Sequence, residues 1–89
     1  MPRFFTTKQF GKDFKKAIKS GKSRDKIVTV LRILAQGDPL PARCRDHKLK
    51  GVFQGRRECH IESDLLLIYK LEDDMIVMER MGSHAELFE

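Results

Sequence analysis

The five residues Leu65-Leu66-Leu67-Ile68-Tyr69 are apolar almost without interruption. A strand with water on one face alternates apolar and polar side chains, whereas a strand covered on both faces is apolar throughout. This stretch therefore predicts a central strand of a sheet, over residues 65–71, with packed layers on both of its faces.

Short polar turns at 62–64 and 72–74 flank this central strand. Turns of this length close antiparallel hairpins, so they predict neighbouring strands at 56–61 and 75–81. Residues 3–6 fit a further short strand at the start of the chain.

The first helical pattern follows that short strand. Phe10, Phe14 and Ile18 recur every four residues, which places them on one face of a helix. Thr6 stands three residues before Gln9, the spacing of a capping box, and Gly21 suits the end of the helix. We therefore expect an amphipathic helix that begins after Thr6 and stops at Gly21.

A second helix is expected after Ser23, a good N-cap residue, with Asp25 in the first turn, where negative charge suits the helix dipole. Gly37 suits the position just past its end. Its expected buried face consists of Ile27, Leu31, Leu34 and Ala35.

These elements predict one α+β domain over residues 1–89, in the order β-α-α-β-β-β. We expect the two helices to form an antiparallel hairpin packed on a small antiparallel sheet. Residues 40–54 lack a period and are expected to form an extended, basic connection. Gly82 is expected to break the last strand, and Ser83 to cap a short C-terminal helical turn.

Charge is unevenly distributed along the chain, although the formal net charge is only +5. Residues 1–50 hold 14 lysines and arginines against 4 acids, whereas residues 51–89 hold 4 against 9. Such a basic half attracts a polyanion such as RNA or DNA, or it is simply a well-solvated helix face.

The composition favours a soluble protein of the cytoplasm. Cys44 and Cys59 match no C-x-x-C spacing and are too few for a disulfide scaffold, so we expect reduced thiols. The N-terminus lacks the apolar region of a signal peptide, and no run approaches the roughly 18 apolar residues of a membrane span.

The predicted strand at 56–61 carries unusual side chains for a strand. Because side chains alternate faces, Glu58 and His60 share one face, while Cys59 and Ile61 share the other. The second pair is expected in the core, and the first is expected to point toward solvent or a ligand.

A set of titratable residues gathers in sequence around this strand. Imidazoles take up and release protons near neutral pH, so two of them can act as base and acid in RNA cleavage without a cofactor. Arginines stabilise the charge that develops on the phosphate, and a carboxylate beside a histidine fixes its tautomer. The candidate catalytic residues are His47, Glu58, His60, Asp64 and His84, with Arg56, Arg57 and Arg80 at the phosphate.

Simpler interpretations of these residues stay open. Isolated histidines are often structural, and Glu58 has Arg56 within reach on the same strand. Three histidines and a carboxylate also match the composition of a zinc site, although no H-x-x-x-H spacing is present, so we expect no metal.

Four stretches, in this order, resemble the YafQ branch of the RelE/ParE toxin superfamily. They are Arg45-Asp46-His47-Lys48-Leu49-Lys50-Gly51, Gly55-Arg56-Arg57-Glu58-Cys59-His60-Ile61, Asp64-Leu65-Leu66-Leu67-Ile68-Tyr69-Lys70 and Glu79-Arg80-Met81-Gly82-Ser83-His84-Ala85-Glu86-Leu87-Phe88.

The resemblance implies a toxin of a type II toxin–antitoxin module that cleaves mRNA on the ribosome and is neutralised by a cognate antitoxin. It implies that His60 and His84 are the acid/base pair, in an order left open, with His47 as a third imidazole at the phosphate. Glu58 and Asp64 fall on further functional positions. Phe88 is expected to stack on a base, and Lys48 and Lys50 to contact the RNA.

Two other functions remain possible from the residues alone. One is a toxin of the same superfamily that poisons DNA gyrase, which has no need of the histidines. The other is a non-enzymatic nucleic-acid-binding or autorepressor module that uses the lysine-rich helix. We expect the toxin to be monomeric without its antitoxin and to need no cofactor.

Overall fold

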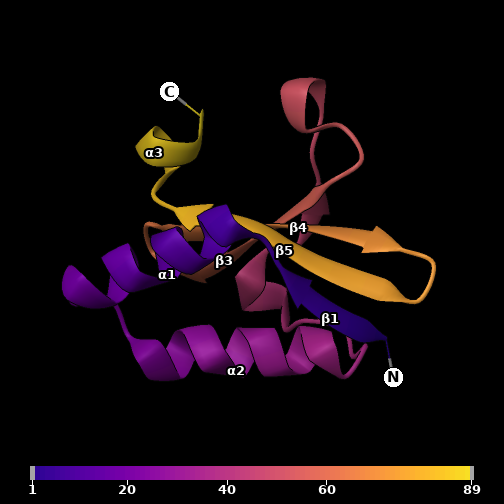
Figure 1. The fold of residues 1–89 in the computed structure, drawn as a ribbon, viewed down its shortest axis with the longest axis horizontal. Coiled ribbons are helices and arrows are strands. Elements are labelled where there is room, and N and C mark those ends of the chain that lie inside the picture. Colours follow the sequence, from indigo (N-terminus) through magenta and orange to yellow (C-terminus); the bar gives the residue numbers. More distant parts are fainter. Residues whose placement is uncertain (1, 89) are drawn as a thin grey trace.

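The computed structural model describes residues 2–88 as three helices on a five-stranded sheet (Figure 1). The strand order in the sheet is β1-β5-β4-β3-β2. The elements are β1 (Arg3–Thr6), α1 (Lys8–Lys19), α2 (Arg24–Ala35), β2 (His47–Lys48), β3 (Arg57–Glu62), β4 (Leu65–Glu72), β5 (Met75–Gly82) and α3 (His84–Phe88), with 3-10 turns at Ala42–Cys44 and Gly51–Phe53.

The apolar strand β4 lies in the middle of the sheet, as predicted. It pairs antiparallel with β3 and with β5, so both hairpins are confirmed. Gly82 is still the last residue of β5, however, and does not break it.

The expectation of a wholly antiparallel sheet was wrong, because β1 pairs parallel with β5, in a register that places Arg3 opposite Met75. No hairpin joins these two strands. The chain leaves β1 directly into α1 and returns to β5 only after the rest of the sheet has been built, so nothing requires an antiparallel pair.

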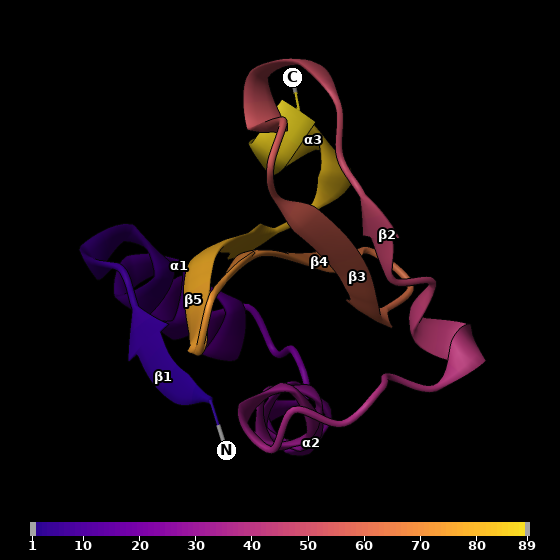
Figure 2. The same cartoon turned by 90° about the vertical axis from the view of Figure 1, so that its right-hand side faces the viewer.

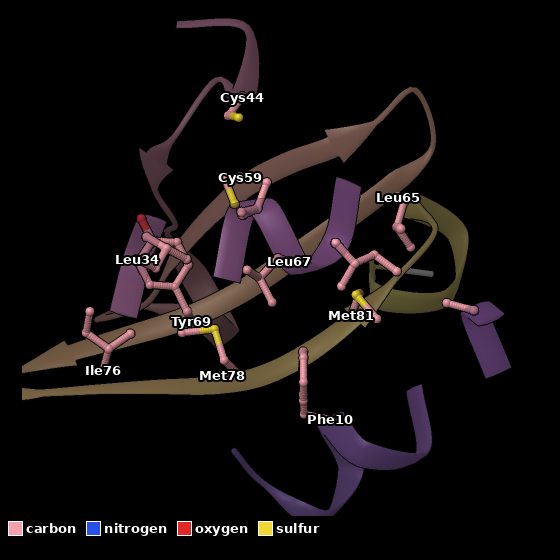
Figure 3. Packing of buried hydrophobic residues seen from close by; sticks show 13 residues of the cluster. Phe10, Leu34, Cys44, Cys59, Leu65, Leu67, Tyr69, Ile76, Met78 and Met81 are labelled. Atoms are coloured by element: carbon pink, nitrogen blue, oxygen red, sulfur yellow. The ribbon is translucent and has the colours of Figure 1, made fainter. Parts of the chain in front are cut away.

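Both long helices cover one face of the sheet (Figures 1 and 2). The larger core lies between them and that face, where Ile27 and Leu34 of α2 and Phe10 of α1 join side chains such as Leu67 and Met78 (Figure 3). On the opposite face a smaller cluster contains Leu66, Ile68 and Leu87, with Leu49, Phe53 and Phe88 at its edge. Strand β4 thus supplies apolar side chains to two layers, which explains its unbroken apolar sequence.

The cap of α1 differs from the expectation. Thr7, one residue later than predicted, accepts the hydrogen bond from the Phe10 N–H at 3.0 Å. Thr6 cannot serve because it is paired with Met78 in the β1–β5 ladder. Gln9 donates to Asp13 instead of reaching back to the cap.

The remaining helix signals are confirmed. Ser23 caps α2 by accepting from the Lys26 N–H at 3.2 Å, and Gly37 follows the helix with a φ of +76°. Gly21, just past α1, has a φ of +88°, which only glycine adopts without strain.

The basic connection over residues 40–54 holds more structure than expected. It contains the two-residue strand β2, which pairs antiparallel with β3 at the sheet edge, between two 3-10 turns. A strand this short is below the length at which alternation can be recognised. Of the helices within residues 2–88, none is long and apolar enough to cross a membrane.

Candidate functional site

The carboxylate of Glu58 lies between two imidazoles. Strand β2 places His47 directly opposite Glu58, and His60 follows two residues later on the same face of β3. The Nε2 atoms of His47 and His60 are 3.6 Å and 3.5 Å from Glu58 Oε1. The same carboxylate oxygen therefore lies within ion-pair distance of both rings.

Glu58 is more buried than expected for a residue that points toward solvent, with a side chain only 7% exposed. It also does not pair with Arg56, because that guanidinium donates through Nε to Glu79 at 2.5 Å. Burial of a carboxylate is costly unless it has partners, and the two histidines are those partners here. The predicted alternation is confirmed, since Cys59 and Ile61 face the larger core.

The tautomer of His47 is set by the backbone. Its Nδ1 lies 2.7 Å from the carbonyl oxygen of Arg45, an acceptor only, so Nδ1 must carry the proton. Nε2 is the nitrogen that faces Glu58, and it can donate to that carboxylate only when the ring is protonated on both nitrogens. This is the arrangement needed to exchange a proton through Nε2.

A second group of candidate residues gathers around α3. Asp64 accepts a hydrogen bond from the backbone N–H of His84 at 3.2 Å, which ties the start of α3 to the β3–β4 turn. The His84 and Phe88 rings have their centroids 5.1 Å apart, and Phe53 meets Phe88 edge-on at 5.6 Å. Sequence reasoning missed Phe53, because it is a single aromatic in a connection without a period.

The two groups share the face of the sheet opposite the long helices. His60 is paired with Leu66, and Leu66 is paired in turn with Gly82, two residues before His84. Since adjacent strands lie about 4.8 Å apart, the backbones at His60 and Gly82 are about 10 Å apart. The end of β5, which leads into His84, is therefore two strands away from His60.

Helix α3 is held by a capping box at its start. The N–H of Ser83 donates to Glu86 Oε1 at 2.8 Å, and the N–H of Glu86 donates to Ser83 Oγ at 3.1 Å, so the predicted cap is confirmed. Glu86 also forms an ion pair with Lys16 of α1. A Cβ on Gly82 would come within 3.0 Å of Glu86 Oε1, so glycine permits this close approach.

This arrangement predicts how α3 responds to acid. The hydrogen bond from Lys16 and then that from the Ser83 N–H lower the pKa of Glu86 to about 2. A lowered pKa means that the stabilisation is complete above the usual value of 4.5 and is lost as the pH falls toward about 2. The Ser83 amide proton, followed by NMR, is expected to titrate with a midpoint near the lower value. In Lys16→Met the midpoint should move up, and a wild-type midpoint near the ordinary value would contradict the contact.

The predicted arginines are all engaged with carboxylates. Besides the bond from Arg56 to Glu79, Arg57 Nε donates to Asp46 at 3.1 Å and Arg80 Nε donates to Asp13 at 2.9 Å. These bonds raise the pKa values of Arg56 and Arg57. The arginines are therefore fixed in place by the fold.

The two predicted lysines lie at and just after β2, at the edge of the sheet. Lys48 is paired with Arg57 and so faces away from His47, and Lys50 is exposed. Both lysines line a groove of about 770 Å³ together with Arg56, Arg57 and the exposed Leu71. Within residues 2–88 no group of three or more His, Cys, Asp or Glu side chains is arranged to hold a metal ion.

The fold and the site define a small α+β domain in which His47, Glu58 and His60 share one face of the sheet, and Asp64 and His84 meet at the start of α3. The model of one family, described as the bacterial toxin of type II toxin-antitoxin system, YafQ, matches residues 3–89. The chain belongs to this family.

Three relatives illustrate the match. The mRNA interferase toxin YafQ of Escherichia coli K12 is 43% identical over 81 residues, which cover 90% of this chain and 88% of the relative. The crystal structure of the E. coli DinJ-YafQ toxin-antitoxin complex contains a chain that is 40% identical, with a TM-score of 0.92 and full coverage of both chains. A metal-bound toxin from Helicobacter pylori is 39% identical, with a TM-score of 0.89, covering 99% of this chain and all of its own.

Proposed function

We propose that this YafQ-family toxin cleaves mRNA on the ribosome by metal-independent acid–base catalysis at its histidine face. Family membership makes the chain an mRNA interferase, which is an endoribonuclease. The observation that supports this chemistry most is the buried Glu58 carboxylate between the Nε2 atoms of His47 and His60. Neither gyrase poisoning nor simple nucleic-acid binding requires this arrangement of a carboxylate and two imidazoles.

The proposed reaction is a transesterification within the RNA. A histidine base removes the proton of a ribose 2′-OH, and the 2′-oxygen attacks the adjacent phosphorus. The bond from phosphorus to the 5′-oxygen breaks, and a histidine acid protonates that oxygen. We assign these roles to His60 and His84, with His47 at the phosphate and Glu58 orienting both His47 and His60.

The remaining candidates position the substrate. Asp64 accepts a hydrogen bond from the backbone N–H of His84, the first residue of α3, and so positions this histidine. Phe88 stands beside His84 and against Phe53, so we assign it to base stacking.

Among the cations, Arg80 is held through Nε alone, and we assign its terminal amino groups to the phosphate. Lys48 and Lys50 are assigned to the RNA backbone further along. Arg56 and Arg57 were also expected at the phosphate. Arg57 is paired with Lys48 and Tyr69, on the face away from His47, and Arg56 donates to both Glu79 and the Gln54 carbonyl, so we assign both to a structural role.

A cognate antitoxin is the expected protein partner, as in the E. coli complex. The excess of basic residues in the first half of the chain favours an antitoxin that is acidic where it meets α1, α2 or the site. Because the substrate is mRNA under translation, we place the action of the toxin in the cytoplasm.

The direct test is cleavage of a defined mRNA by the purified chain, with and without translating ribosomes, in EDTA. The proposal predicts cuts that require ribosomes and persist in EDTA. Because metal binds to the H. pylori relative, add-back of zinc or copper is the matched control. Cuts that vanish with EDTA and return with the metal would overturn the metal-independent mechanism. Cuts on free RNA would show that cleavage does not require the ribosome.

A further inference from the structure

One carboxylate oxygen of Asp46 receives two hydrogen bonds from the sheet. The Tyr69 hydroxyl donates to Asp46 Oδ1 at 2.5 Å, and Arg57 Nε donates to the same oxygen at 3.1 Å. The Asp46 side chain is 27% exposed, and of its two bonds the one from Tyr69 is partly buried while the one from Arg57 lies at the surface. A bond to an ionised group in such a place is stronger than one between neutral groups.

The two donors are rigid parts of the fold. Tyr69 belongs to the central strand β4, is 1% exposed and packs in the larger core (Figure 3). Burial, followed by the hydrogen bond to Asp46, raises the pKa of Tyr69, so its hydroxyl stays protonated and remains a donor. Arg57 belongs to β3, and the hydrogen bond to Asp46 likewise raises its pKa.

Strand β2, which follows Asp46, has few contacts of its own to hold it on the sheet. Strand β2 has two residues and one neighbour, β3, at the edge of the sheet. The chain enters it from Arg45, whose φ of 51° is a left-handed conformation that non-glycine residues rarely adopt. A ladder this short is expected to fray in isolation.

His47 follows Asp46 directly. Because side chains alternate along the strand, the anchor lies on one side of the sheet edge and the His47 ring on the other, against Glu58. The carbonyl oxygen that sets the His47 tautomer belongs to Arg45, on the other side of Asp46. Fixing Asp46 therefore fixes both the ring and its hydrogen-bond partner.

We propose that Asp46, Tyr69 and Arg57 form a clamp that positions His47 for catalysis. This inference rests on the proposed nuclease function. It gives Asp46 and Tyr69 a role that the reaction itself does not assign to them, and it makes Arg57 a positioning residue.

The first test is a double-mutant cycle in the cleavage assay. Tyr69→Phe removes one hydroxyl and is expected to lower the cleavage rate about tenfold with KM changed less than about twofold. In a His47→Ala background the same substitution should have less than about a twofold effect, because the positioned ring is already gone. Equal losses in both backgrounds would show a general structural defect and overturn the clamp.

The second test needs no activity. The Leu49 N–H donates to the Arg56 carbonyl at 2.9 Å, just after β2, so its hydrogen exchange reports whether this edge is closed. Tyr69→Phe removes the donor and Asp46→Ala removes the acceptor. Each should speed this exchange about tenfold, because each variant lacks roughly one hydrogen bond to a charged group that keeps the edge closed.

Asp74→Ala, which removes an exposed bond to Arg3, is the matched control and should leave both the exchange and the cleavage rate unchanged. Unchanged Leu49 exchange in both clamp variants would overturn the inference. If instead the wild-type chain cuts no RNA while the exchange responds as expected, the nuclease function fails and the clamp remains as an anchor of β2.

Discussion

Replacing His60 or His84 by alanine is expected to reduce mRNA cleavage about 10²- to 10⁴-fold, the range attributed to general acid–base catalysis. Both residues lie on the face of the sheet opposite the long helices, His60 against the buried Glu58 and His84 at the start of α3. Neither belongs to the larger core, so the fold is expected to survive. The measurement is the single-turnover cleavage rate on programmed ribosomes, with thermal unfolding alongside.

The matched control is His60→Gln, which keeps a polar side chain of similar reach but cannot exchange a proton near neutral pH. It should be as inactive as the alanine variant. Activity close to wild type in His60→Gln would show that His60 contributes hydrogen bonding and not proton transfer. Full activity in both alanine variants would remove the acid–base mechanism altogether.

Asp13→Ala is expected to destabilise the fold by about 2–3 kcal/mol, the largest stability effect that the polar contacts predict. Asp13 lies on α1, is 9% exposed and accepts hydrogen bonds from Arg80 Nε, the Met81 N–H and Gln9. Burial alone would raise the pKa of Asp13, but these three bonds lower it below 3.8. The alanine variant leaves the Met81 N–H and the arginine without their acceptor.

Urea unfolding measures this loss. Asp74→Ala is the control, because its ion pair with Arg3 is exposed and is expected to contribute less than about 1 kcal/mol. The Asp13 contribution should be full above the ordinary pKa of 3.8 and disappear as the pH falls below it, since the folded-state pKa is lowered. Equal effects of the two substitutions would contradict the packing of α1 on β5 described here.

Much of this fold follows from local patterns. The apolar run over Leu65–Tyr69 predicted a central strand because only a strand with two buried faces tolerates such a sequence, and β4 meets that condition. Ser23 and Ser83 marked helix starts because a hydroxyl can satisfy the first free N–H groups. Alternation along β3 correctly predicted that Glu58 and His60 share one face, which is the face of the smaller apolar cluster.

Other features depend on contacts between distant parts of the chain. No local pattern assigned a role to Asp13, on the lysine-rich helix, yet this carboxylate accepts hydrogen bonds from Arg80 and Met81, at the other end of the chain. The bond from Tyr69 to Asp46 is equally non-local, because a tyrosine in an apolar run reads as core. Such pairs become visible only when the sheet brings the segments together.

Strand pairing shows the same limit. Nothing in residues 3–6 indicates whether they pair parallel or antiparallel, since the direction depends on how the chain returns. Arg56 and Arg57 were expected at the phosphate because they lie close in sequence to the histidines. Their actual partners, such as Glu79 for Arg56, were set by the sheet.

The most direct test of the histidine acid–base mechanism is the chemistry of the RNA ends that cleavage produces. Attack by the 2′-OH with histidines as base and acid leaves a 2′,3′-cyclic phosphate on the upstream fragment and a 5′-hydroxyl on the downstream one. The measurement is mass spectrometry of the fragments cut on ribosomes in EDTA. The proposed mechanism predicts these two ends. Fragments that carry a 3′-hydroxyl and a 5′-phosphate would instead require a water nucleophile and would contradict it.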